Sequence, residues 1–235
     1  MNKFNSNQSI GQIVAMFPKA GEIFMEYRID FCCGGHRPLI DAIKAQNINI
    51  IELLDKLETA FSDITKQTDQ IDYNCIKSDA LIDYIIHKHH GYLNRSLPEI
   101  SELSHTILRV HGANHKELFD LHKLFHSLKS ELELHLVKEE TLLFPLIKDY
   151  EQNPSPELLK KIGDTLEELE SEHDGAGDIL KELRSLTKDY TLPDDVCRTY
   201  ELTYEKIQEL EADLFQHIHL ENNILFLRYH SSVLV

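Results

Sequence analysis

Apolar residues recur along most of the chain at spacings of three and four, which is the period of a helix that packs on one face. Four long segments show this pattern, at about 78–108, 113–149, 156–189 and 194–229. No stretch shows the alternation of period two that is typical of a half-buried β-strand. Long amphipathic helices with short connections predict an up-down-up-down four-helix bundle, so the expected fold class is all-α.

The first 65 residues predict a small helical domain in front of the bundle. Its helices are expected over residues 9–17, 18–27, 38–45 and 49–61. Ser9 and Asn49 are residue types that cap helix N-termini. Between the second and third helix the chain reads Phe31-Cys-Cys-Gly-Gly-His36, a turn whose glycines are free to adopt positive φ. The expected domains are a helical domain over 1–65, a polar linker over 66–77 and the four-helix bundle over 78–235.

Histidine and glutamate take positions in the apolar stripes that aliphatic residues would otherwise fill. Two stripes have identical spacing, Leu128, Leu132, His135, Glu139, Leu142 and Leu210, Leu214, His217, Glu221, Ile224. The other two helices contribute His90 and His173, and the gaps from these to His135 and His217 are 45 and 44 residues. Burying such groups costs several kcal/mol unless something compensates. The repeat therefore predicts six metal ligands, namely His90, His135, Glu139, His173, His217 and Glu221.

The predicted ligands are imidazoles and carboxylates, without thiolates. Two glutamates can each bridge two ions, which leaves two histidines as terminal ligands for each ion. This composition favours a pair of iron ions, with an oxo or hydroxo bridge as an option, and its open positions suit O₂ or NO. Pairs of zinc or manganese ions remain open on the ligand types alone.

The remaining histidines are expected to be peripheral. Those that fall off the seams predict surface positions: His87, His89, His105, His219 and His230. His111, His115, His122 and His126 share one helical stripe, which favours a partly exposed face over a second metal site or an iron path. His111 is kept as a candidate for a further imidazole ligand or for a group that supports a ligand.

Charge and cysteine usage limit the classes of function. The net charge of −16 comes without a basic block, which disfavours nucleic acid and anionic membrane as partners. No apolar signal-peptide region is seen at the N-terminus, and no apolar run approaches the roughly 20 residues that span a bilayer, so we expect a cytoplasmic protein. Cys32 and Cys33 are adjacent, where a disulfide would be strained, and Cys75 and Cys197 are isolated.

The motifs together resemble a known family. His-x-x-x-Glu within a four-helix bundle is similar to the hemerythrin-like domain. The chain as a whole resembles the family of iron–sulfur cluster repair di-iron proteins, also called the repair of iron centres family. The motifs that carry this resemblance are Asp30-Phe-Cys-Cys-Gly-Gly35, His135-x-x-x-Glu139-Glu140, Ser171-Glu-His173-Asp and His217-x-x-x-Glu221-Asn-Asn. The resemblance implies the same six metal ligands and a role in restoring iron–sulfur clusters damaged by nitric oxide or peroxide, through supply of iron. One departure is Leu227, where a proline would be expected after Phe226.

Three functions compete at this point. The chain is expected to be a stress-response repair protein that acts on damaged iron–sulfur proteins, with Cys32 and Cys33 as functional thiols. The alternatives are a carrier or sensor of O₂ or NO and a purely structural metal-binding bundle. The N-terminal Cys-Cys domain favours repair, because a carrier needs no thiol module. The sequence does not decide whether the protein turns over a substrate, and it leaves open whether the chain forms a homodimer.

Overall fold

The computed structural model describes residues 3–64 and 72–230, so residues 66–71 of the predicted linker lie outside the described residues and 72–77 lie within them. Within these two ranges the chain forms helices and no strand, and its β-type pairing is limited to one isolated bridge between Ser9 and Pro38. The all-α class is confirmed. By density of contacts the chain divides into two compact units, 82–214 and 1–81 with 215–235. We describe each unit by itself.

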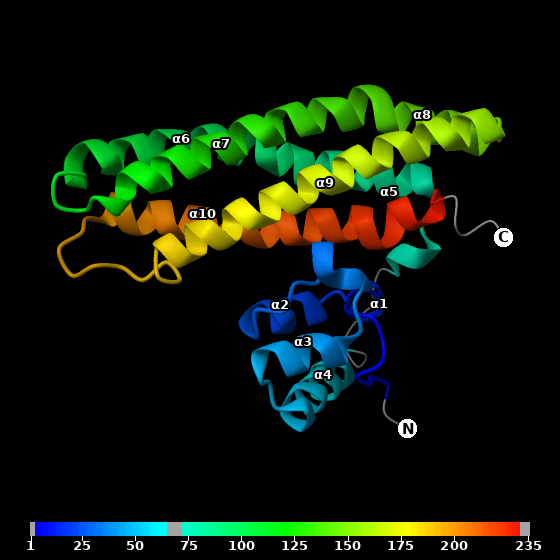
Figure 1. Ribbon diagram of the computed structural model, residues 1–235, viewed down its shortest axis with the longest axis horizontal. Helices are drawn as coiled ribbons and strands as arrows, with labels where there is room; N and C mark the ends of the chain where they lie inside the picture. Colours follow the sequence, from blue (N-terminus) through cyan, green and yellow to red (C-terminus); the bar gives the residue numbers. More distant parts are fainter. Residues whose placement is uncertain (1–2, 65–71, 231–235) are drawn as a thin grey trace. The chain divides into compact units, whose positions relative to one another are not determined.

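The unit of residues 82–214 is the four-helix bundle. Its helices are α5 (Ser78–Ile85), α6 (Gly91–His111), α7 (Glu117–Lys138), α8 (Phe144–Gln152), α9 (Pro156–Leu186) and α10 (Arg198–Leu220). Helix α5 begins before the first residue of this unit, and α10 ends after its last residue. The long helices α6, α7, α9 and α10 lie side by side, and α8 continues the line of α7 before the chain turns into α9 (Figure 1). Ser155 caps α9 by accepting a hydrogen bond from the Leu158 N–H, with Pro156 in the first turn.

Three π-helical turns interrupt the long helices that the sequence predicts as continuous. They are η3 (Ile86–His90), η4 (Glu139–Leu143) and η5 (Glu221–Leu225), the last followed by the 3₁₀ turn η6 (Phe226–Arg228). A π turn inserts one residue and rotates the following side chains around the helix. The predicted core position of Leu142 is therefore wrong, since Leu142 is 46% exposed and Leu143 is fully buried in its place.

The other unit contains the small helices of the N-terminal region. They are α1 (Ile10–Met16), α2 (Ala20–Glu26), η1 (Cys33–His36), α3 (Leu39–Gln46), α4 (Ile50–Ile64) and η2 (Tyr73–Cys75). The Ser9 hydroxyl accepts a hydrogen bond from the Gln12 N–H, and Asn49 caps α4 through its side-chain oxygen, as predicted. Rings of Phe4, Phe17 and Phe61 pack together in its core.

The glycines of the Cys-Cys-Gly-Gly turn serve close packing. No glycine among the described residues has positive φ, so the conformational freedom expected of this turn is unused. A Cβ on Gly35 would instead lie 2.4 Å from the side-chain oxygen of Asn223. Gly11 faces the same side chain at 2.5 Å. Absence of a side chain at both positions lets Asn223 approach the backbone of the turn.

Candidate metal centre

The six side chains predicted as metal ligands form two overlapping groups. The groups are His90, Glu139, His217, Glu221 and His135, Glu139, His173, Glu221. Within each group, one nitrogen or carboxylate oxygen from every residue lies within 4.8 Å of those of the others. Glu139 and Glu221 belong to both groups. Each group thus offers two imidazoles and two shared carboxylates to one cation.

The π turns determine where these ligands point. His90 is the last residue of η3, and Glu139 and Glu221 are the first residues of η4 and η5. The i,i+4 pairs bring His135 Nε2 to 3.3 Å from Glu139 Oε1, and His217 Nε2 to 3.1 Å from Glu221 Oε1. His90 Nε2 lies 3.3 Å from the second oxygen of Glu139. Single π turns occur often at functional sites, and here each one carries a predicted ligand.

The burial of these groups fits a bound cation. Both glutamates are 0% exposed, and the four histidines are between 1% and 3% exposed. His135 Nε2 and His173 Nε2 face each other at 3.0 Å, a contact in which only one neutral ring can donate. A metal ion accepts electron pairs from both nitrogens and neutralises the buried carboxylates. The donor set suits iron, zinc or manganese, all of which bind imidazole together with carboxylate.

Two carboxylates outside the ligand set orient the histidines. His90 Nδ1 lies 2.8 Å from Glu140 Oε1, and His135 Nδ1 lies 2.8 Å from Glu172 Oε2. An N–H on Nδ1 that donates to carboxylate leaves Nε2 free to bind metal. We did not assign this role from the sequence. The available signal was position, because Glu140 follows the ligand Glu139 and Glu172 precedes the ligand His173.

Glu172 is itself held in its charged form. Burial alone would raise its pKa, but hydrogen bonds from Lys138 and His135 outweigh burial and place the pKa below its usual value. Lys138 also donates a hydrogen bond to Glu168. This chain of Lys138, Glu172 and His135 supplies a negative partner for the imidazole at neutral pH, which raises the basicity of a metal-binding nitrogen.

Two histidines predicted at the surface are buried instead. His89 and His219 are each 1% exposed, so their surface assignment is wrong. His89 Nδ1 lies 3.0 Å from an oxygen of Asp213, and His219 Nδ1 lies 3.4 Å from the Phe31 carbonyl oxygen. Burial lowers the pKa of His219 to about 4, so its ring is neutral at pH 7. His87 and His105 are exposed, as expected.

The predicted thiol pair forms a separate group of polar side chains. Asp30, Cys32 and Cys33 offer one carboxylate oxygen and two sulfurs within 4.8 Å of one another. Asp30 Oδ1 accepts hydrogen bonds from the Gly34 N–H at 3.0 Å and from the Cys32 thiol at 3.3 Å. All four cysteines are free. The hydrogen bond with Cys33, together with burial and the Asp30 charge, raises the pKa of Cys32 well above its usual value, so it is a protonated thiol.

The thiol turn packs against residues beside two predicted ligands, within the same compact unit. The Asn223 amide donates to the Cys32 carbonyl oxygen at 2.8 Å, and Asn223 follows Glu221 by two positions in η5. The Phe31 ring contacts Phe215 and His219, with ring centroids 5.9 and 5.8 Å apart, on either side of His217 in sequence. The Cys-Cys turn is therefore fixed to the segment that carries His217 and Glu221.

Comparison with known proteins agrees with this architecture. The hemerythrin HHE cation binding domain matches residues 81–229, and a domain of unknown function called ScdA_N matches residues 6–60. Iron-sulfur cluster repair protein ScdA of Staphylococcus epidermidis is 32% identical over 92% of this chain and 95% of that protein. Iron-sulfur cluster repair proteins YtfE of Salmonella typhimurium and of an Enterobacter species are 31% and 33% identical, each over 94% of this chain and 96% of its own length.

No helix in the described part of the chain has the length and apolar character needed to cross a bilayer. The match to the cation-binding domain covers more than half of the sequence, and the relatives align over more than nine-tenths of this chain. The buried His/Glu groups occupy the region that this domain covers. The chain belongs to the hemerythrin HHE family, within the group of two-domain iron–sulfur cluster repair proteins.

Proposed function

We propose that the bundle holds two iron ions. His90 and His217 would be the terminal ligands of one ion, and His135 and His173 those of the other. Glu139 and Glu221 would bridge them, because each belongs to both ligand groups. Bound there, the irons supply redox and Lewis-acid chemistry at positions that remain open to a small molecule such as O₂ or NO.

Two irons per chain are the expected stoichiometry, because two ligand groups share two carboxylates. Iron analysis of protein purified without oxygen should give about two ions per chain, and Mössbauer spectra should show an exchange-coupled pair. Zinc at stoichiometric level, or one isolated iron, would contradict the assignment. The same measurement on a His173→Ala variant serves as an internal comparison, since only one of the two ligand groups contains His173.

The function that we propose is repair of damaged iron–sulfur clusters by transfer of iron. The observation that carries it is the attachment of the Asp30, Cys32 and Cys33 group to the π turn that begins at Glu221. Thiolates bind iron well, and a carboxylate beside them adds a harder ligand. Because Cys32 is protonated in the described structure, binding of a metal ion there must release its proton. Iron loading of the turn is then expected to weaken at low pH.

Replacement of both thiols tests the hand-off. Cys32→Ser/Cys33→Ser should leave the di-iron spectrum intact, because neither side chain belongs to the ligand groups of the bundle. Recovery of a damaged iron–sulfur enzyme in a reconstitution assay should fall several-fold. Cys75→Ser is the matched control, since Cys75 is also free but exposed and bonded to Asp72.

Full repair by the double variant would assign the pair to packing alone. Loss of the di-iron spectrum would mean that the turn is needed to keep Glu221 in place, through its contact with Asn223. The first result would remove the thiols from the proposed function, and the second would show that the thiol turn and the metal centre are not separable. The relatives named as repair proteins support the choice of iron–sulfur proteins as partners. A cytoplasmic location is part of the proposal.

A carrier or sensor of O₂ or NO is the second candidate. It rests on the open coordination that six protein ligands leave around two irons. Reversible optical changes with O₂, together with undiminished repair by iron-loaded protein under anaerobic conditions, would show that small-molecule binding is separate from repair.

A further inference from the structure

A second group of titratable side chains lies in the bundle unit, where α6 ends and α10 begins. Cys197 directly precedes α10, and its carbonyl oxygen accepts hydrogen bonds from the backbone N–H groups of Tyr200 and Glu201. His111 is the last residue of α6, and its Nε2 lies 3.2 Å from the Cys197 sulfur. The thiol is exposed, whereas the Tyr200 ring against which His111 packs is buried.

We propose that Cys197 and His111 form a nucleophilic thiolate–imidazolium pair that is oxidised by small neutral peroxides. An exposed sulfur beside a histidine, at the N-terminus of a 23-residue helix, has the surroundings of a reactive cysteine. This site is independent of the proposed iron transfer, since none of its residues belongs to a metal-ligand group.

The electrostatics of the pair support this assignment. The hydrogen bond with His111 is the largest influence on the thiol, the Tyr200 and Thr199 backbone groups add to it, and they lower the pKa of Cys197 to about 7. Cys75 is a natural contrast within the same chain. It is also exposed, but its thiol donates to Asp72 at 3.3 Å, and this hydrogen bond to a carboxylate raises its pKa.

The neighbouring charges favour a neutral oxidant. His115 sits between two carboxylates, with Nδ1 3.2 Å from Glu117 and Nε2 3.1 Å from Asp195. The cation nearest in sequence, Arg198, is engaged by Glu201 and Glu205. The chain as a whole also carries a net charge of −16. An oxidant that is negatively charged, such as an acidic disulfide, is therefore disfavoured at this end of the bundle. Hydrogen peroxide is small and uncharged.

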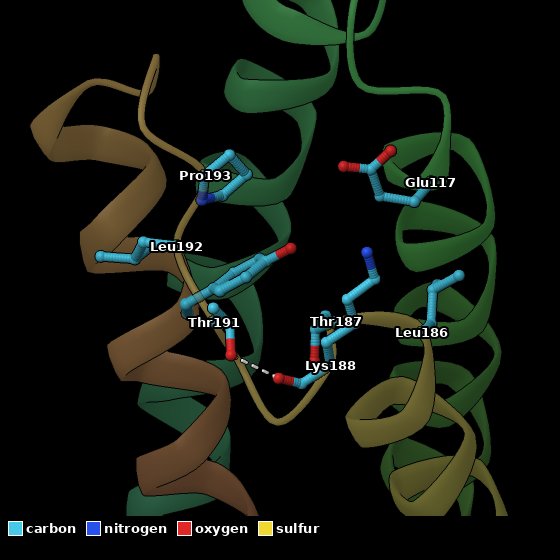
Figure 2. Close-up of a pocket in the computed structure, with 8 residues that line it drawn as sticks. Glu117, Leu186, Thr187, Lys188, Thr191, Leu192 and Pro193 are labelled. Carbon is cyan, nitrogen blue, oxygen red and sulfur yellow. Dashed lines mark hydrogen bonds between the residues drawn. The ribbon is translucent and has the colours of Figure 1, made fainter.

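A hollow of about 310 Å³ opens beside this group. Its lining includes Glu117, which bonds His115, and Tyr204, whose hydroxyl lies 3.1 Å from that of Tyr200. Figure 2 shows Glu117 and Lys188 directed toward each other across the hollow, with Pro193 on the loop that leads to α10. His111 and Cys197 do not line the hollow, which meets this group through Glu117 and Tyr204.

Oxidation of the Cys197 thiol by hydrogen peroxide needs no further reactant. The proton of the Cys197 thiol moves to His111, and the thiolate sulfur attacks one oxygen of hydrogen peroxide. An S–O bond forms as the O–O bond breaks, so sulfur loses two electrons and peroxide gains them. The departing hydroxide takes the proton from the His111 imidazolium and leaves as water, and Cys197 becomes a sulfenic acid.

The test measures alkylation of the full-length protein by iodoacetamide at several pH values, with each cysteine followed by peptide mass analysis. At pH 7 about half of Cys197 is thiolate, against a few per cent of an ordinary thiol. Since a lower pKa also weakens the nucleophile, Cys197 should react at least about threefold faster than Cys75 at this pH. Its rate should level off above pH 8, where that of Cys75 still rises.

His111→Gln removes the imidazole and should shift the Cys197 profile toward that of Cys75. His126→Gln, which removes a histidine from α7, should leave the Cys197 profile unchanged. Brief treatment with hydrogen peroxide should then place a dimedone adduct on Cys197 and little on Cys75. Equal pH profiles for the two cysteines in the wild-type protein, or a dimedone adduct on Cys75 in preference to Cys197, would overturn the proposal.

Discussion

Glu139→Gln is expected to abolish the di-iron centre while leaving the bundle folded. Glu139 belongs to both ligand groups, and its two oxygens face His135 and His90 at 3.3 Å each. Glutamine keeps the volume but removes the negative charge and one metal-binding oxygen. Removal of a residue that only hydrogen-bonds to a metal ligand already lowers metal affinity about 10- to 100-fold. Loss of a shared ligand should exceed this, so purified variant should contain little iron and show no exchange coupling.

A graded series makes this result specific. Glu140→Gln removes the carboxylate that orients His90, so iron affinity should fall by an intermediate amount. Glu131→Gln changes an exposed residue of α7 and should retain wild-type iron. Circular dichroism checks the helical content of all three variants. Wild-type iron content and coupling in Glu139→Gln would remove Glu139 from the ligand set.

Removal of the metal should lower the melting temperature by on the order of 10 °C. Metal that binds only the folded chain, at about 1,000 times its dissociation constant, stabilises that chain by about 4 kcal/mol. For a chain of this size, each kcal/mol shifts the midpoint by roughly 2–4 °C. The physical reason is that Glu139 and Glu221 are 0% exposed and are buried together with four imidazoles. A bound cation neutralises the two carboxylates, whereas without it they repel each other and have lost their hydration.

Calorimetry of iron-loaded and chelator-treated protein measures the difference. Re-addition of ferrous iron to the chelated sample should restore the higher midpoint. The Glu139→Gln variant provides the control, because chelator should hardly change its melting if the effect comes from this site. Identical midpoints for loaded and stripped wild-type protein would mean that the six side chains are solvated in solution.

The sequence alone determined the class of the fold and the position of the six His and Glu side chains. Helical periodicity is a local property, and the bundle is its simplest packing solution, so the stripe from Ile162 to Leu183 is buried throughout, as predicted. Ser9, Asn49 and Ser155 marked helix starts because a side-chain cap acts within one turn. A charged residue at a repeated core position indicates a bound cation, whatever the details of packing.

Tertiary structure decided what depends on partners distant in sequence. The three π turns depart from the helical period on which the predicted stripes rest, and they moved Leu142 out of the core in favour of Leu143. His219 is buried because Phe31 packs on it from 188 residues away. The carboxylates that orient His90 and His135 became visible only when separate helices met. The same is true of Cys197, an isolated residue in the sequence, which gains its imidazole neighbour only because the ends of two bundle helices lie together.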